Sequence, residues 1–242
     1  MSRIAELIDA STEPFLSIRQ GSSLLLIINR PAARNALTRQ MRRDFPALVA
    51  AADADESVAA VILTGADPSF SAGVDLKERA AGAQPPITPH PGEVLRAVRK
   101  PIIAAVNGAC VTGALEMALS CSFIIASSEA RFADTHARVG LVPRWGQTAL
   151  LPSAIGFRRA RQMMLTGEFI DAGTALAWGL VNEVVAHDQL IDRCLALGEQ
   201  IARASTSSVS AQLHASRTTA AAALAAGLDA ERQALSVWDA AQ

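Results

Sequence analysis

Three segments of the chain place an apolar run before a turn of small residues and a helix. The runs VAAVILTG at 58–65 and PIIAAVNG at 101–108 show no alternation of polar and apolar side chains. Continuous apolar strands are typical of parallel sheets that are covered on both faces. The recurring order of strand, turn and helix therefore predicts an α/β layered fold. Its repeating units are expected at 58–80, 102–121 and, in a shorter version, 123–138.

The N-terminal region carries a second kind of pattern. Residues 13–19 and 23–29 predict two strands joined by a Gln20-Gly21 turn. Thr38 is expected to cap a helix over 39–53, because apolar side chains recur there at helical spacing.

The remaining segments are read as a loop and a set of helices. Residues 82–93 hold four prolines and two glycines, which predicts a loop or a lid within the domain, bordering a pocket. The segment VLRAVRK at 94–100 is expected to be helical. From Pro152 on, the sequence is alanine-rich and helical in pattern, with the last two helices at about 188–204 and 207–240.

Composition narrows the class of protein. The chain has 242 residues and a net charge of −1, so we expect no general attraction to nucleic acid or to a membrane surface. The longest apolar region contains Asn107 and Glu116 and is a poor membrane span. Three cysteines without a CxxC motif predict neither a disulfide framework nor a metal site. With no signal-peptide pattern at the start, a cytoplasmic protein is expected. Half of the residues are hydrophobic, which points to surface buried between subunits.

Glu116 is the only charged side chain between Pro101 and Ser128. Burial without a cation raises the pKa of a carboxyl, and a carboxyl that titrates near neutrality can take and return protons. The alternative is a core glutamate whose carboxylate is satisfied by a neighbouring amide or arginine. The stretch alone leaves both interpretations open.

Two similar turns follow the apolar strands, one at 69–76 and the other at 107–116. If they face each other, each can supply one backbone N–H to a single carbonyl oxygen, which would form an oxyanion hole. Glycine turns after strands are also ordinary in α/β folds, so a purely structural role stays open. The second turn has P-loop glycine spacing but lacks the Lys-Ser/Thr pair, and no GxGxxG motif for a nicotinamide cofactor is present.

Five collinear motifs carry a family resemblance: NRPAARNAL (29–37), LTGADPSFSAGVDLKE (63–78), KPIIAAVNGACVTGALEMAL (100–119), ARFADTHARVGLVPRWGQTALL (130–151) and LTGEFIDAGTALAWGLVNEVV (165–185). In these motifs the chain resembles the crotonase family of enoyl-CoA hydratases and isomerases. The resemblance implies a spiral of ββα units as the acyl-CoA-binding core at 1–190, and a helical region at 191–242 that serves trimer contacts. A homotrimer or a dimer of trimers is the implied assembly. The substrate would be an acyl-CoA thioester, with CoA as part of the substrate and no separate cofactor or metal.

The same resemblance implies roles for particular residues. The thioester oxygen would lie between the backbone N–H groups of Val74 and Gly113. Arg34 and Lys77 are candidate partners for the CoA phosphates, or simply solvated surface charges. Many family members extend further and close a last helix over CoA, so the closure of the CoA site is expected to differ here. The residues expected to line the CoA and thioester region are Ala72, Val74, Asp75, Leu76 and Lys77.

Hydratases of this family carry two catalytic carboxylates, of which Glu116 matches the first. The second position holds His136, where family members commonly have a proline-glutamate pair in place of Thr135-His136. Histidine can also act as a general acid or base near neutral pH. The alternative is a structural histidine that is hydrogen-bonded to a neighbour such as Asp134. Arg144 and Trp145 are expected either to shape the acyl pocket or to serve as a surface charge and a packing residue.

Three functions are compatible with these residues. The first is an enoyl-CoA hydratase, in which Glu116 positions or deprotonates water and His136 assists proton transfer. The second keeps the fold and the oxyanion hole but isomerises, hydrolyses, decarboxylates or cleaves its substrate. The third is a non-catalytic acyl-CoA-binding protein, which would make little use of a buried lone carboxyl. Product analysis and the sensitivity of binding to Glu116→Gln distinguish them.

Overall fold

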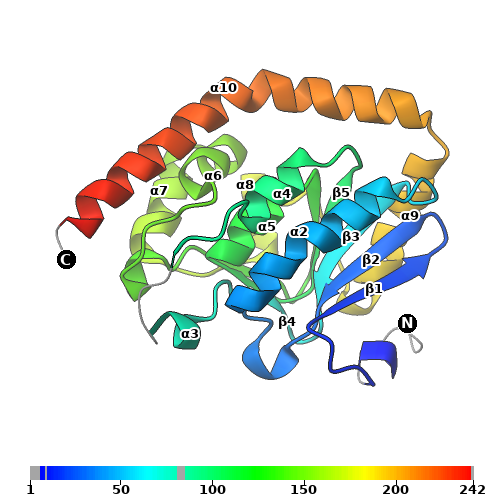
Figure 1. Cartoon of the computed structure of the whole chain (residues 1–242), viewed down its shortest axis with the longest axis horizontal. Helices are drawn as coiled ribbons and strands as arrows, with labels where there is room; N and C mark the ends of the chain where they lie inside the picture. The colour runs from blue at the N-terminus through cyan, green and yellow to red at the C-terminus, as the bar shows by residue number, and fades with distance from the viewer. Residues whose placement is uncertain (1–5, 9, 81–84, 241–242) are drawn as a thin grey trace.

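The computed structural model describes residues 6–8, 10–80 and 85–240. Two sheets form its centre, and helices cover them (Figure 1). In chain order the elements are β1 (Phe15–Gln20), β2 (Ser23–Ile28), η1 (Pro31–Ala33), α2 (Arg39–Ala54), β3 (Ala60–Gly65), β4 (Ser69–Ser71), α3 (Leu76–Ala80), α4 (Pro91–Ala97), β5 (Ile102–Val106), β6 (Ala109–Val111), α5 (Gly113–Ser120), β7 (Phe123–Ser127), β8 (Arg131–Ala133), η2 (Ala137–Val139), α6 (Gln147–Ile155), α7 (Phe157–Thr166), β9 (Ile170–Asp171), α8 (Ala172–Trp178), β10 (Glu183–Val185), η3 (His187–Gln189), α9 (Leu190–Ala202) and α10 (Thr206–Asp239).

The larger sheet has six strands in the order β1-β2-β3-β5-β7-β10. Only the β1–β2 pair is antiparallel, and the other neighbours are parallel. The smaller sheet has the order β4-β6-β8-β9, with β4, β6 and β8 parallel. Each central unit therefore consists of a long strand, a strand of three residues and a helix or helical turn, which confirms the predicted fold class.

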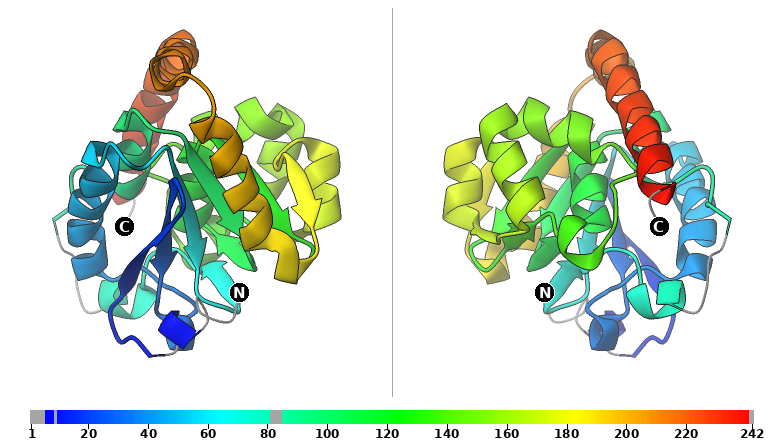
Figure 2. Two further views of the ribbon diagram at one scale, coloured as in Figure 1. Left: turned by 90° about the vertical axis from the view of Figure 1, so that its right-hand side faces the viewer. Right: turned by 90° about the vertical axis from the view of Figure 1, so that its left-hand side faces the viewer.

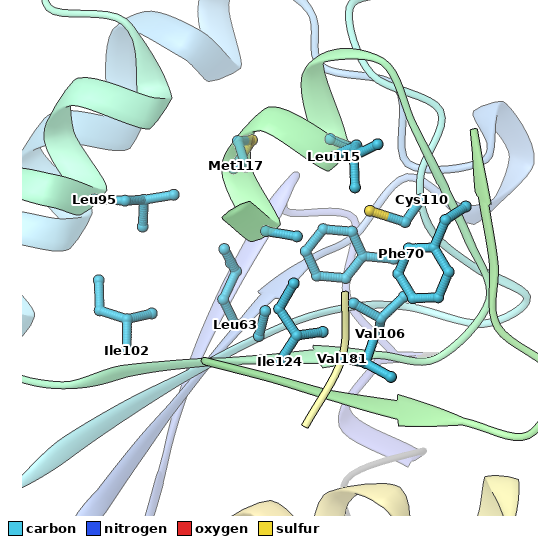
Figure 3. Close-up of a cluster of buried hydrophobic side chains, with 14 of the residues drawn as sticks. Leu63, Phe70, Leu95, Ile102, Val106, Cys110, Leu115, Met117, Ile124 and Val181 are labelled. Carbon is cyan, nitrogen blue, oxygen red and sulfur yellow. The ribbon is translucent and has the colours of Figure 1, made fainter. Parts of the chain in front are cut away.

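Side chains from both faces of the larger sheet are buried, as the lack of alternation predicts. One face of β3 places Val61 and Leu63 in the main core, and the other face places Ile62 against α9. Figure 3 shows how Leu63, Phe70 and Met117 converge from three different elements of the main core. Because helices cover both faces, the ends of the central strands form a rigid support for the turns that follow them.

Two helices begin earlier than the sequence pattern predicts. The predicted loop at 82–93 ends sooner, because α4 starts at Pro91 and ends at Ala97. Proline suits the first turn of a helix, and His90 Nδ1 accepts the Glu93 N–H at 3.0 Å as a cap. Residues 82–84 of that loop lie outside the described part of the chain. The C-terminal helices likewise start before Pro152, since α6 begins at Gln147.

The last helix, α10, runs along the whole molecule and packs its second half against α6 (Figures 1 and 2). Gly227 allows this contact, because a Cβ there would lie 2.3 Å from Ala149 Cβ. Of the helices in the described residues, none is both long and apolar enough to cross a membrane.

Candidate active site

The two predicted turns lie side by side. Parallel pairing of β4 with β6 brings the turn after β4 next to the turn after β6. Gly73 has a φ of +83°, and a Cβ at this position would lie 2.4 Å from Thr112 Oγ1 and 3.2 Å from the Gly113 nitrogen. Only glycine allows this approach without displacing the neighbouring turn.

The two residues whose backbone amides are predicted to form the oxyanion hole line the same cavity. Leu37 forms a parallel bridge with the first turn: its N–H donates to Gly73 O at 2.8 Å, and its carbonyl accepts the Asp75 N–H at 3.0 Å. The N–H of the intervening Val74 therefore points away from Leu37. Within the described residues, neither the Val74 nor the Gly113 N–H donates a hydrogen bond to the protein. Both residues line one cavity.

Glu116 lies in the first turn of α5, with only 2% of its surface exposed. Its Oε1 accepts two backbone N–H groups, from Trp145 at 2.7 Å and from Gln147 at 3.2 Å. Its Oε2 is left facing His136 Nε2 at 3.7 Å. The carboxylate is thus satisfied by amides, as the structural interpretation expects, and it also lines the cavity.

His136 is held by Asp134 from the other side. The Asp134 Oδ1 accepts the His136 backbone N–H at 3.1 Å and lies 2.6 Å from His136 Nδ1. A carboxylate at this distance keeps a proton on Nδ1, so that Nε2 is the atom that exchanges a proton. The residue is both hydrogen-bonded to Asp134 and part of the cavity wall opposite Glu116.

The pKa values of the two groups are both perturbed. Burial raises the pKa of Glu116 to about 7, although attraction to His136 opposes this rise. Burial lowers the pKa of His136, but the hydrogen bond to Asp134 and the charge of Glu116 outweigh it, and the net pKa is raised. The Glu116 carboxyl therefore titrates near neutrality, where it can exchange protons with a bound molecule.

The cavity has a volume of about 720 Å³. Trp145 forms part of its wall and packs against the turn at 107–116, since a Cβ on Gly113 would lie 2.8 Å from Trp145 Cζ3. His90 stacks on the same indole, with ring centroids 5.9 Å apart. The end of α10 also contributes, through Trp238 and Asp239.

The predicted binding residues divide into two groups. Ala72, Val74, Leu76, Arg144 and Trp145 line the cavity, as does the part of the proline-rich loop at 85–91.

Arg34, Asp75 and Lys77 are not in the cavity wall formed by the described residues. Arg34 is exposed in a left-handed turn, and Asp75 pairs with Arg30 at 3.1 Å. Their predicted contacts with CoA stay predictions. Two basic residues that the sequence did not single out, Arg39 and Arg42 on α2, line the cavity instead.

Comparison with known proteins gives one consistent result. The family model described as enoyl-CoA hydratase/isomerase matches residues 19–240. A probable enoyl-CoA hydratase of Rhizobium meliloti is 37% identical over 92% of this chain and 88% of its own length. The 2,3-dehydroadipyl-CoA hydratase of Escherichia coli is 37% identical over 89% of this chain and 86% of its own. The crystal structure of an enoyl-CoA hydratase from Mycobacterium avium aligns with a TM-score of 0.88 and 44% identity, covering 95% of this chain and 98% of that one.

Proposed function

Because the chain belongs to the enoyl-CoA hydratase/isomerase family, we propose that it adds water across the double bond of a trans-2-enoyl-CoA. The product would be a 3-hydroxyacyl-CoA, and CoA is part of the substrate. One observation carries the proposal: Glu116, His136 and two backbone amides that donate to no acceptor among the described residues all belong to the wall of a single cavity.

The Val74 and Gly113 amides act on the thioester oxygen. Addition of water at C3 moves negative charge onto this oxygen as an enolate forms. Two N–H groups that are already in place stabilise that charge without reorganisation, and losing one such donor typically costs about 3–4 kcal/mol of barrier. Gly73 and Thr112, which both have a positive φ, hold the Val74 and Gly113 amides close together.

Glu116 and His136 divide the proton transfers. Because the pKa of Glu116 is about 7, its ionised form is available near neutral pH, and this form takes a proton from water as the water oxygen bonds to C3. The protonated His136 gives its Nε2 proton to C2, which completes the product. The 3.7 Å gap between Glu116 Oε2 and His136 Nε2 is too long for a direct hydrogen bond. After the product leaves, Glu116 releases the acquired proton to solvent in the cavity and His136 takes one up, which restores both groups. Asp134 stabilises the imidazolium throughout.

The test is turnover of trans-2-enoyl-CoA thioesters, followed by the loss of the conjugated absorbance and by product mass. Glu116→Gln and His136→Ala should each lower kcat by about 10²–10⁴-fold, the usual contribution of a general acid or base. Glu168→Gln and His214→Ala are matched controls, since both residues are exposed and neither lines the cavity formed by the described residues. Products of isomerisation, thioester hydrolysis, decarboxylation or C–C cleavage, or binding without turnover, would refute the hydratase assignment.

We further propose a homotrimer or dimer of trimers in the cytoplasm. The apolar composition supports the assembly, as do the exposed side chains of Phe157 and Leu165 on α7, which are 66% and 77% exposed in the single chain. Light scattering should give three or six times the chain mass of 25.3 kDa, and a monomer would contradict the proposal.

A further inference from the structure

Four successive backbone amides donate alternately to two buried carboxylates. These amides form the turn at 145–148, where α6 begins, and the carboxylates belong to Glu116 on α5 and Glu231 on α10. The bonds are Trp145 N to Glu116 Oε1 at 2.7 Å, Gly146 N to Glu231 Oε2 at 3.0 Å, Gln147 N to Glu116 Oε1 at 3.2 Å and Thr148 N to Glu231 Oε1 at 2.8 Å.

Glu231 is the residue that fastens α10 to this turn. It is only 3% exposed, although most of α10 faces solvent. Its carboxylate accepts a third hydrogen bond, from Thr148 Oγ1 at 2.7 Å. One turn before it, Gly227 packs directly on Ala149 of α6. Two turns after it, Trp238 lies in the cavity wall. The same face of α10 thus reaches both the turn and the cavity.

We propose that Glu231 is a positioning residue for Glu116, which couples the protonation of Glu116 to the docking of α10. Both carboxylates accept hydrogen bonds from the same turn at 145–148. A shift of the amides at 146 and 148, which bind Glu231, therefore also moves those at 145 and 147, which bind Glu116. The inference rests on the proposed role of Glu116 as the general base.

The charges around Glu116 determine the sign of the effect. Attraction to His136 lowers the pKa of Glu116, whereas repulsion from Glu231 raises it, both acting on top of burial. The charged or titratable groups around Glu116 include His136 and, behind it, Asp134 from the β8–η2 segment, Arg96 from α4 and Glu231 from α10. His90 of α4 lines the same cavity and stacks on Trp145. His90 is neutral near pH 7, because burial lowers its pKa to about 4. Removing the Glu231 charge should therefore lower the pKa of Glu116.

Glu231→Gln tests this coupling by pH-dependent infrared spectroscopy. The C=O stretch of protonated Glu116 is identified by its loss in Glu116→Gln, and its titration midpoint is then compared between variants. In Glu231→Gln the titration midpoint of Glu116 should fall, and the acid limb of the kcat/KM profile should shift to lower pH with it. Asp229→Asn is the matched control, because it removes one negative charge from an exposed position of the same helix. Its midpoint should equal that of the wild type.

A second variant perturbs the docking without changing a charge. Gly227→Ala forces α10 away from Ala149. The midpoint should fall if Glu231 alone withdraws, and it should rise if the turn moves with it and loosens the Trp145 and Gln147 amides, whose bonds lower the pKa of Glu116. If either folded variant loses stability but keeps the wild-type midpoint, Glu231 is merely structural and the inference is wrong. Because the infrared titration needs no turnover, it decides this question even if the chain proves not to hydrate enoyl-CoA.

Discussion

Glu116→Gln should stabilise the folded protein above neutral pH, even though it removes the proposed general base. The glutamine retains both backbone bonds, because the Trp145 and Gln147 amides donate to the same oxygen, Oε1. What the substitution removes is a carboxylate that is only 2% exposed and must ionise inside the protein. The cost of that ionisation disappears with it.

The magnitude follows from the pKa. Glu116 titrates at about 7 in the folded state against 4.5 for the ordinary group. A difference of about 2.5 units at 1.36 kcal/mol each corresponds to about 3 kcal/mol. Because the pKa of Glu116 is raised in the folded state, its ionisation destabilises the folded protein relative to the unfolded chain. This destabilisation is absent below pH 4.5, grows as the unfolded chain releases its proton first, and is complete above about pH 7. Thermal unfolding is the assay, and this gain corresponds to about 6–12 °C in Tm for a chain of this size.

Protein concentration must be kept fixed in these measurements, because assembly also raises Tm. His136 titrates together with Glu116, so the comparison should be repeated in a His136→Gln background. There the attraction that lowers the Glu116 pKa is gone, and the gain should be larger. A difference in Tm between wild type and Glu116→Gln that does not change between pH 4.5 and 8 would show that Glu116 is not held at a raised pKa.

Three further substitutions test the support of the site. Asp134→Asn should lower the pKa of His136, since the substitution removes a carboxylate that raises this pKa. Nitrogen NMR of the imidazole measures the titration, and an unchanged titration would show that the contact with Asp134 is unimportant. Gly73→Ala should lower turnover by about 100-fold or more with folding retained, because the new Cβ collides with Thr112 Oγ1. Full activity would show that the turn at 69–76 tolerates a side chain at this position. Asn35→Ala should cost about 3 kcal/mol in urea unfolding, because this fully buried amide donates to two backbone carbonyls and accepts one N–H; a loss below 1 kcal/mol would contradict that role.

The sequence predicts the long elements of the fold because their signals are local. The apolar strands at 60–65 and 102–106 are buried on both faces, and their composition alone indicates it. The three-residue strands β4, β6 and β8 are too short for any periodic signal, and they exist because they pair with one another in the smaller sheet. Only the family resemblance anticipates them, as the second strand of each ββα unit.

The site divides in the same way. Glu116 is found from sequence because it is the lone charge in an apolar stretch. Arg39 and Arg42 are not, because on the amphipathic helix α2 a basic side chain looks like any solvated one. Glu231 on α10 is missed for the same reason, because a glutamate on a polar helix looks like a solvated side chain. Its burial depends on a tertiary contact with residues far away in the chain.

The contrast between the two buried glutamates explains why only one is suited to catalysis. Glu231 uses both oxygens for three hydrogen bonds, and it is absent from the cavity wall formed by the described residues. Glu116 takes its two amides on Oε1 alone, so Oε2 keeps its lone pairs toward His136 and the cavity. A general base needs one oxygen within reach of the proton that it removes, and the other held still. The turn at 145–148 meets both needs by dividing its four amides between the two carboxylates.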